Sequence, residues 1–153
     1  MSTKYFILAT AAVLGSAWTG MHVSPSYVAN MTGAQETPAL SVSGTGTATF
    51  NIIDTKLHYV VRVNGLSGNP TAAHIHVGAV GVAGPPVYSF VLKSGAGMNG
   101  AITEGMFDLT TNASAGVSGD SLKALLANGN AYVNVHTAAH PGGEVRGQVV
   151  PRK

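Results

Sequence analysis

The sequence predicts an all-β domain, an antiparallel Greek-key sandwich or barrel with one short helix. From about residue 28 onward, short runs of β-branched and aromatic residues alternate with clusters of glycine, proline and asparagine, a pattern typical of such folds. The chain has 153 residues, which is enough for one domain of this kind. We expect strands at residues 27–32, 46–53, 56–64, 72–77, 87–92, 101–109, 131–136 and 144–150.

Two of the connections can be interpreted from their residues. Asp54 and Thr55 form a two-residue break between two strand patterns, which predicts a tight hairpin. Residues 118–128 carry three leucines at helical spacing, with Ser118 or Asp120 available as N-cap and a glycine just beyond the last periodic residue. The short helix is therefore expected near 118–128, where it would cover a barrel end or bridge two sheets.

The composition excludes several classes of protein. Charged residues make up only 9% of the chain and the net charge is +2, which excludes a disordered chain and a coiled coil. The chain has no run of basic residues, so we expect no nucleic-acid partner. Because it has no cysteine, it forms no disulfide and offers no thiol nucleophile or thiolate ligand. Any chemistry would depend on histidine, carboxylate, hydroxyl or backbone groups.

The first residues are typical of a secretory signal peptide. Lys4 precedes an apolar run over residues 5–14, and residues 15–17 are small, as a cleavage site requires. The run is shorter than the roughly 20 residues that a membrane-spanning helix needs. We therefore expect a leader over residues 1–17, or one extending to about residue 22, and a secreted or extracytoplasmic mature domain. A membrane would be a partner only if the leader stayed uncleaved.

Three histidines are placed to share one metal ion. His74 and His76 stand two residues apart in a predicted strand, so both side chains project from one face, opposite Ile75. His136 has the same relation to the valines of a later strand. Three imidazoles leave an open coordination position on copper or zinc. Copper is the expected cofactor because it outcompetes zinc at nitrogen sites, and zinc is the alternative. His140 is a candidate fourth ligand.

Residues of the last predicted strand could assist these ligands. If residues 137–143 form a hairpin loop, Glu144 lies opposite His136 and Arg146 lies opposite Asn134. Glu144 could then accept the free ring N–H of a liganding histidine, with Asn134 beside the ligands. Arg146 could attract a small anion such as superoxide. In the alternative interpretation, Glu144 and Arg146 form a surface ion pair of little energetic consequence, and the histidines are solvated residues without a metal.

Five segments of the chain also match the pattern of a known domain: residues 31–38 (MTGAQETP), 44–50, 66–68, 72–76 (AAHIH) and 131–148 (AYVNVHTAAHPGGEVRGQ). Together they resemble the CHRD domain, which was first described as a repeat in chordin and also occurs alone in exported microbial proteins. The resemblance covers about residues 28–150, which we expect to form one domain. It implies an all-β domain of immunoglobulin-like or barrel architecture.

A second resemblance concerns the candidate ligands. His74 and His76 are similar to the H-x-H copper ligands of copper/zinc superoxide dismutase, His136 to its late V-H ligand and Arg146 to its anion-guiding arginine. The chain has no counterpart of that enzyme's histidine-rich zinc loop, of its bridging histidine or of its disulfide cysteines. The resemblance therefore implies a copper-only site on a superoxide-dismutase-like fold.

Three functions remain open on this basis. The favoured one is an exported domain that holds copper at the three-histidine site for storage, delivery or tolerance. The second is a copper-dependent oxidoreductase of superoxide dismutase type, in which Arg146 guides the anion. The third is a structural or adhesive extracellular domain that binds protein ligands and no metal.

Overall fold

The structure is a computed structural model that describes residues 24–111 and 116–152. The predicted leader lies outside the described residues. Besides one short 3-10 turn at Gly33–Gln35, the described chain forms nine strands and one helix. These are β1 (Ser26–Thr32), β2 (Thr45–Ile53), β3 (Lys56–Asn64), β4 (Pro70–Val77), β5 (Pro86–Ser89), β6 (Gly100–Asp108), α1 (Gly119–Ala127), β7 (Ala131–Thr137), β8 (Val145–Gln148) and β9 (Val150–Pro151).

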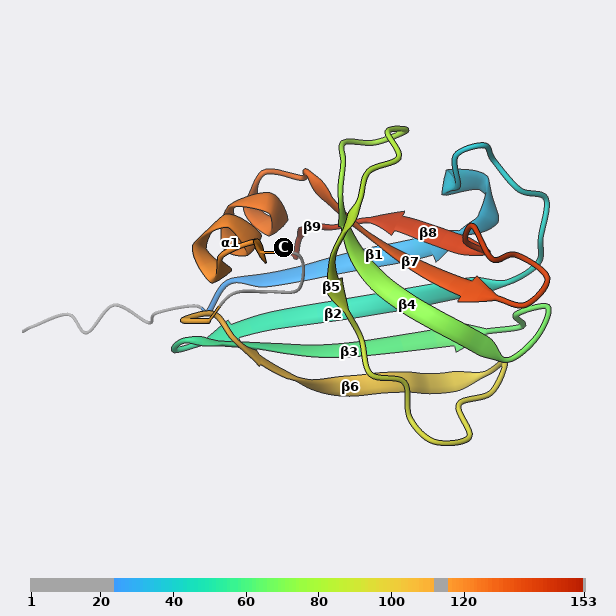
Figure 1. Ribbon diagram of the computed structural model, residues 1–153, viewed down its shortest axis with the longest axis horizontal. Coiled ribbons are helices and arrows are strands. Elements are labelled where there is room, and N and C mark those ends of the chain that lie inside the picture. Colours follow the sequence, from blue (N-terminus) through green and yellow to red (C-terminus); the bar gives the residue numbers. More distant parts are fainter. Residues whose placement is uncertain (1–23, 112–115, 153) are drawn as a thin grey trace, which may run out of the picture.

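The strands form a single antiparallel sheet in the order β5-β4-β7-β8-β1-β2-β3-β6, with β9 also paired to β1. The sheet is curled: β1, β2, β3 and β6 run side by side, and β4 crosses in front of them (Figure 1). The expected all-β architecture and the single helix are confirmed. Asp54 has a φ of 53° in the two-residue turn between β2 and β3, as the predicted tight hairpin requires.

Most predicted strand boundaries lie within two residues of the observed ones, and two of the predicted strands differ more clearly. The strand predicted at 144–150 is interrupted at Val149, although β8 and β9 keep one register, with Arg146 opposite Thr32 and Val150 opposite Val28. β5 ends at Ser89 rather than at residue 92. The chain after β5 leaves its partner β4 and turns to β6, where the Lys93 N–H donates to the Ile102 carbonyl oxygen at 2.8 Å.

Aromatic side chains bring the two ends of the strand order together. Phe90, just after β5, lies 4.9 Å from Tyr59 of β3 and 6.5 Å from Phe50 of β2, measured between ring centroids. Tyr88 of β5 lies 5.1 Å from Phe107 of β6. Aromatic pairs at these separations add stability beyond the apolar area that they bury. The sheet therefore curls because its terminal strands share one aromatic cluster.

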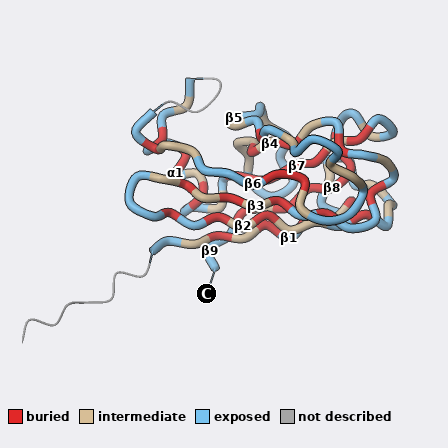
Figure 2. The backbone as a smooth tube through the Cα atoms, turned by 90° about the horizontal axis from the view of Figure 1, so that it is seen from below, coloured by how far each residue is buried: buried red, intermediate tan, exposed pale blue. Residues whose placement is uncertain are grey.

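The interior of the curl is filled by the inward-facing residues of nearly every strand, and buried positions recur along β2, β3 and β7 (Figure 2). α1 packs Leu122 and Leu126 into this core, both fully buried. Ser118 is its N-cap, since the Ser118 hydroxyl accepts a hydrogen bond from the Ser121 N–H. On β4 and β7, Ile75 and Val133 point inward, which leaves the alternate residues on the outer face.

We predict that Phe90→Ala lowers the free energy of unfolding by about 3–5 kcal/mol, the usual cost of truncating a buried aromatic side chain. The physical reason is that the variant loses the ring that connects the end of β5 to β2 and β3. Denaturant unfolding measures the change. The neighbouring Val91→Ala is the control, because Val91 is 81% exposed and its truncation should have little effect.

Candidate metal centre

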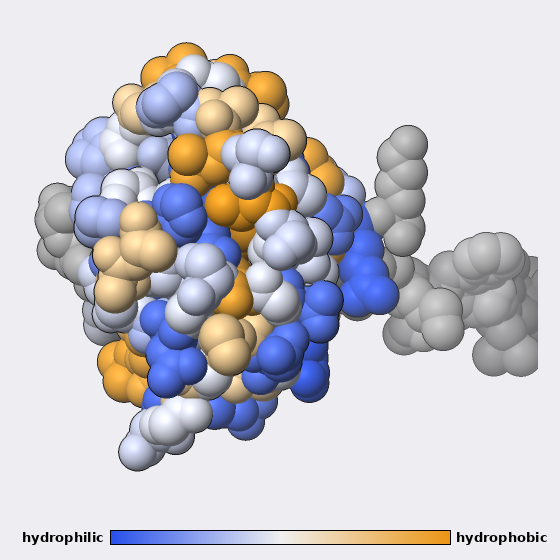
Figure 3. All heavy atoms as spheres, turned by 90° about the vertical axis from the view of Figure 1, so that its right-hand side faces the viewer, coloured by the Kyte–Doolittle hydropathy of each residue, from blue (hydrophilic) through white to orange (hydrophobic). Residues whose placement is uncertain are grey.

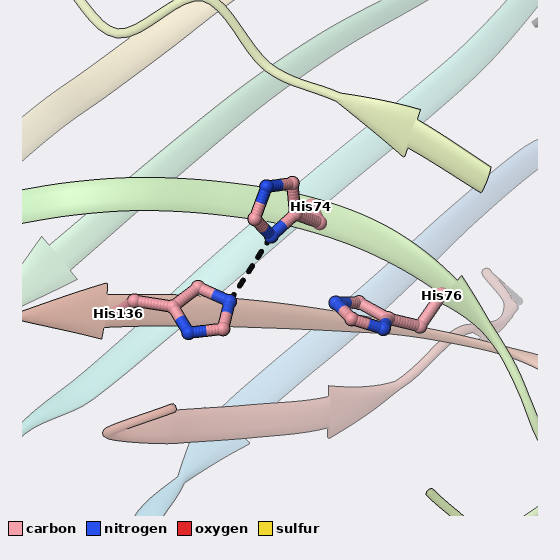
Figure 4. Close-up of side chains that lie close together, drawn as sticks. All are labelled: His74, His76 and His136. Carbon is pink, nitrogen blue, oxygen red and sulfur yellow. Dashed lines mark hydrogen bonds between the residues drawn. The ribbon is translucent and has the colours of Figure 1, made fainter. Parts of the chain in front are cut away.

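His74 and His76 of β4 and His136 of β7 come together on the outer face of the sheet (Figure 4). Each side chain offers one ring nitrogen, and these three atoms lie within 4.8 Å of one another. The register explains the geometry, because His136 pairs with Ala72 and is therefore a diagonal neighbour of His74. The structure thus brings together the three histidines that the sequence predicts.

Backbone carbonyls hold two of the three imidazoles. Nδ1 of His76 lies 2.8 Å from the Gly84 carbonyl oxygen, and Nδ1 of His136 lies 2.9 Å from the Pro141 carbonyl oxygen. A carbonyl oxygen can only accept, so each Nδ1 carries the hydrogen and each Nε2 presents a lone pair. Ligand histidines in metalloproteins are commonly held in this way.

The three rings bring ring nitrogens close to one another. Nδ1 of His74 lies 3.0 Å from Nε2 of His136 and donates its hydrogen to it. Nε2 of His76 is buried and has no hydrogen-bond partner, and its ring points toward the other two (Figure 4). A cation between the rings would satisfy this orphaned nitrogen. It would also require the hydrogen on Nδ1 of His74 to move to Nε2 of the same ring.

All three imidazoles are neutral at pH 7. Burial and the neighbouring His136 and His76 lower the pKa of His74 to about 4. Burial also lowers the pKa of His76 and of His136, although the hydrogen bonds to the backbone carbonyls oppose this shift. Neutral imidazole is the form that binds metal, so protons do not compete for these lone pairs near neutrality.

Over β7 and β8, the outer face of the sheet is covered by the loop at residues 78–85, which forms a second layer and turns backbone carbonyls toward the side chains of these strands. Nη2 of Arg146 donates to the carbonyl oxygens of Ala79 and Val82, at 3.2 and 2.8 Å. Nε2 of Gln148 donates to the Gly78 carbonyl oxygen at 2.8 Å. The loop also exposes apolar residues, among them Val80 at 79%, and it forms part of the apolar top of the molecule in Figure 3.

A stack of three side chains connects this layer to the site. Tyr132 lies against His76 with a centroid separation of 4.8 Å and nearly parallel rings. The guanidinium carbon of Arg146 lies 3.5 Å from the centroid of the Tyr132 ring, in a cation–π contact. The Tyr132 hydroxyl donates to the Gly84 carbonyl oxygen, which also accepts from His76. Loop, arginine and ligand ring are therefore held as one unit.

Arg146 is not the surface residue that the sequence suggested. It pairs with Asn134 as expected, but its side chain is buried, with 2% of the residue exposed. Its hydrogen bonds go to protein oxygens, including Oγ1 of Thr37. A guanidinium enclosed in this way is poorly placed to capture an anion from solvent, so the geometry argues against the guiding role.

Glu144 also takes a different role from the expected one. Glu144 is fully buried, and its carboxylate accepts hydrogen bonds from the Ser67 N–H, the Ser67 hydroxyl and the Thr137 hydroxyl at 2.6–2.7 Å. Burial raises the pKa of Glu144, but these hydrogen bonds outweigh that effect and lower it. The ring N–H groups of His76 and His136 donate to backbone carbonyls instead. Glu144 therefore holds the β7–β8 turn to the loop after β3.

The other two predicted residues lie beside the cluster. His140 is in the β7–β8 turn, near Glu144, and is not part of the three-histidine group. Asn134 is buried, and its amide nitrogen donates to both carboxylate oxygens of Glu36, at 2.8 and 3.0 Å. Its Oδ1 has no partner. Burial raises the pKa of Glu36 to about 7, against the opposing effects of Asn134 and Arg146.

Sequence reasoning missed three residues that shape the site: Tyr132, Gly84 and Glu36. Tyr132 could have been found, because it shares the strand parity of Asn134 and His136. Gly84 and Glu36 lie in segments without strand periodicity. Nothing local to those segments indicates that they fold over the outer face.

The comparison with protein-family models matches residues 27–149 to the CHRD domain. The match spans most of the chain, and the protein belongs to the CHRD domain family, a family of extracellular β-domains. Comparison with curated proteins and with solved structures gave no significant match. Among residues 24–111 and 116–152, no helix is long and apolar enough to cross a membrane.

We predict that Gly84→Ala loosens the ring of His76. A Cβ atom at residue 84 would lie 1.8 Å from the Val77 carbonyl oxygen, so the loop must move away from β4. The Gly84 carbonyl then no longer accepts the hydrogen bond from Nδ1–H of His76. The free energy of unfolding should fall by about 1–3 kcal/mol. Imidazole ¹⁵N shifts should report a mixture of tautomers at His76. Gly97→Ala is the control, since the nearest atom to its added Cβ is 4.0 Å away.

We also predict a pH dependence of stability for the metal-free protein. Below pH 6.5 the unfolded chain binds more protons at His74, His76 and His136 than the folded chain does, and for His74 this difference extends down to about pH 4. The free energy of unfolding therefore falls on acidification through this window. Glu36 acts in the opposite sense between pH 7 and 4.5, because folding raises the pKa of its carboxyl.

Comparison with a variant that carries glutamine at the three histidine positions isolates their effect, since Glu36 is common to both proteins. Urea unfolding in chelator-treated buffer measures the difference in stability from pH 7.5 to pH 4. The parent should lose stability relative to the variant as the pH falls. A difference that does not change with pH would contradict the assigned pKa shifts.

Proposed function

We propose that this protein is an exported copper-binding domain that holds one ion between His74, His76 and His136. The observation that carries the proposal is the buried, unpartnered Nε2 of His76, directed at two further imidazoles. A buried polar atom without a partner costs free energy, and native proteins retain few of them without a reason. Coordination to a cation would supply the missing partner.

The surroundings of the three rings support coordination. Two rings have their Nδ1–H groups held by backbone carbonyls, and all three are neutral at pH 7. The nitrogens lie within 4.8 Å of one another, so modest movements of the side chains would bring them to a common ion at the usual metal–nitrogen distance of about 2 Å. Solvated surface histidines would lack this combination of burial, neutrality and fixed orientation.

Copper is the metal that this donor set favours. Among divalent ions, Cu(II) binds imidazole nitrogens more tightly than Zn(II) does at comparable geometry. A catalytic zinc site would also need a general base, and the carboxylate of Glu144 is engaged by Ser67 and Thr137. Copper held for storage, delivery or tolerance therefore agrees better with the site than zinc hydrolysis does.

The surroundings of the site also favour copper binding over catalysis of superoxide dismutation. The superoxide-dismutase-like alternative needs an accessible cation to guide the anion, and Arg146 is buried and bonded to protein oxygens. The adhesive alternative gives the histidines no task, and leaves their convergence unexplained. A superoxide assay on the copper-loaded protein addresses the first alternative, and metal analysis addresses the second.

The proposal predicts that the protein purified after export contains about one copper ion per chain, and that exchanging His74, His76 and His136 for glutamine together abolishes binding. Elemental analysis and competition with a chromophoric chelator give the stoichiometry and affinity. Circular dichroism should show that the variant keeps its β-sheet. His58→Gln is the matched control, because His58 lies on β3 and does not belong to the group. Copper binding by the triple variant at parental affinity would refute the site.

A further inference from the structure

We infer that the site takes copper as Cu(I) rather than Cu(II), and that the buried positive charge of Arg146 favours the monovalent ion. This inference deepens the copper-binding proposal and rests on it. Two features of the structure carry it, the number and kind of ligands and the charge placed behind one of them. Each favours an ion of lower charge and lower coordination number.

The ligand set is small and neutral. Among the described residues, the group that could hold a metal consists of three histidines and includes no carboxylate. His140 does not join it, and Glu144 is engaged elsewhere. Cu(II) prefers tetragonal surroundings with four or more nitrogen and oxygen ligands. Three imidazoles without an anionic ligand satisfy a d¹⁰ cuprous ion better than a cupric one.

A cation lies one aromatic ring away from the ligands. Tyr132 stands between His76 and Arg146, with the His76 ring at 4.8 Å and the guanidinium carbon at 3.5 Å from its centroid. His76 comes from β4 and Arg146 from β8, and these strands flank β7 on opposite sides. The guanidinium and the ligand ring therefore approach Tyr132 from opposite sides, with the charge held at a fixed distance behind the site.

Among the described residues, no carboxylate forms an ion pair or a hydrogen bond with this guanidinium. The hydrogen bonds of Arg146 go to uncharged oxygens, those of Thr37, Ala79 and Val82. The carboxylate that interacts with it electrostatically is Glu36, whose oxygens accept from Asn134. Water screens poorly at a residue that is 2% exposed. A fixed positive charge repels Cu(II) about twice as strongly as Cu(I), so it shifts the preference toward Cu(I).

Arg146 also anchors the loop at residues 78–85, and the two roles can be separated by substitution. Arg146→Lys keeps the positive charge but has a single nitrogen, so it cannot contact Thr37 as Nη1 does and the carbonyls of Ala79 and Val82 as Nη2 does. Arg146→Gln removes the charge and keeps an N–H donor, on a side chain shorter than that of arginine. Tyr132→Phe keeps the ring and removes the hydroxyl that contacts Gly84. If the contacts to the loop alone determined the preference for Cu(I), all three variants would therefore lose part of that preference.

The experiment measures two dissociation constants for each protein at pH 8, one for Cu(I) by anaerobic competition with a bicinchoninate-type chelator and one for Cu(II) by competition with an amino-acid chelator. Their ratio gives the reduction potential of the bound ion. We expect the parent to bind Cu(I) more tightly, and the anaerobically purified protein to contain copper and be silent in EPR. Arg146→Gln should reduce the preference by about tenfold, equivalent to about 60 mV, whereas Arg146→Lys and Tyr132→Phe should preserve it.

Glu36→Gln provides a test that does not depend on how Arg146 variants fold. Removing this carboxylate leaves the guanidinium less compensated, so the preference for Cu(I) should increase. Equal affinities for the two ions in the parent, an equal loss in Arg146→Lys and Arg146→Gln, or no change in Glu36→Gln would each overturn the inference. Absence of binding in either oxidation state would instead overturn the copper-binding proposal itself.

Discussion

The antiparallel register between β4 and β7 is the constraint on which the rest of the structure depends. Because Ile75 pairs with Val133, both side chains enter the core, and the alternate positions of the two strands must face outward together. A slip of one residue would bury the histidines and expose the valines. The core therefore stabilises the site indirectly, since apolar burial on one face determines which side chains meet on the other.

Over β7 and β8, the outer face of the sheet is buried rather than exposed to solvent. The loop at residues 78–85 and the segment around Glu36 cover Tyr132, Asn134 and Arg146, all nearly fully buried. Burial has two consequences for chemistry. It lowers the pKa of the histidines and so keeps them ready for a metal, and it preserves the field of a charged side chain that water would otherwise screen.

Particular residues show how far sequence reasoning reached. His74, His76 and His136 could be grouped in advance, because strand alternation is a local rule and the apolar partners of each strand reveal its inner face. The position of Arg146 opposite Asn134 followed from the length of the hairpin loop. The expected exposure of Arg146 and Glu144 was wrong. Both were treated as exposed, whereas loops distant in the sequence bury them and take up their hydrogen bonds.

The sequence by itself determined the fold class, the strands and the helix, and the face on which the histidines lie, since these follow from periodicity and turn residues within short segments. Only the tertiary structure decided which nitrogens carry hydrogen, which lone pair is left without a partner, and where the positive charge lies relative to the ligands. These features depend on contacts between segments without periodicity. Such contacts are established when the sheet curls and its loops cover the outer face.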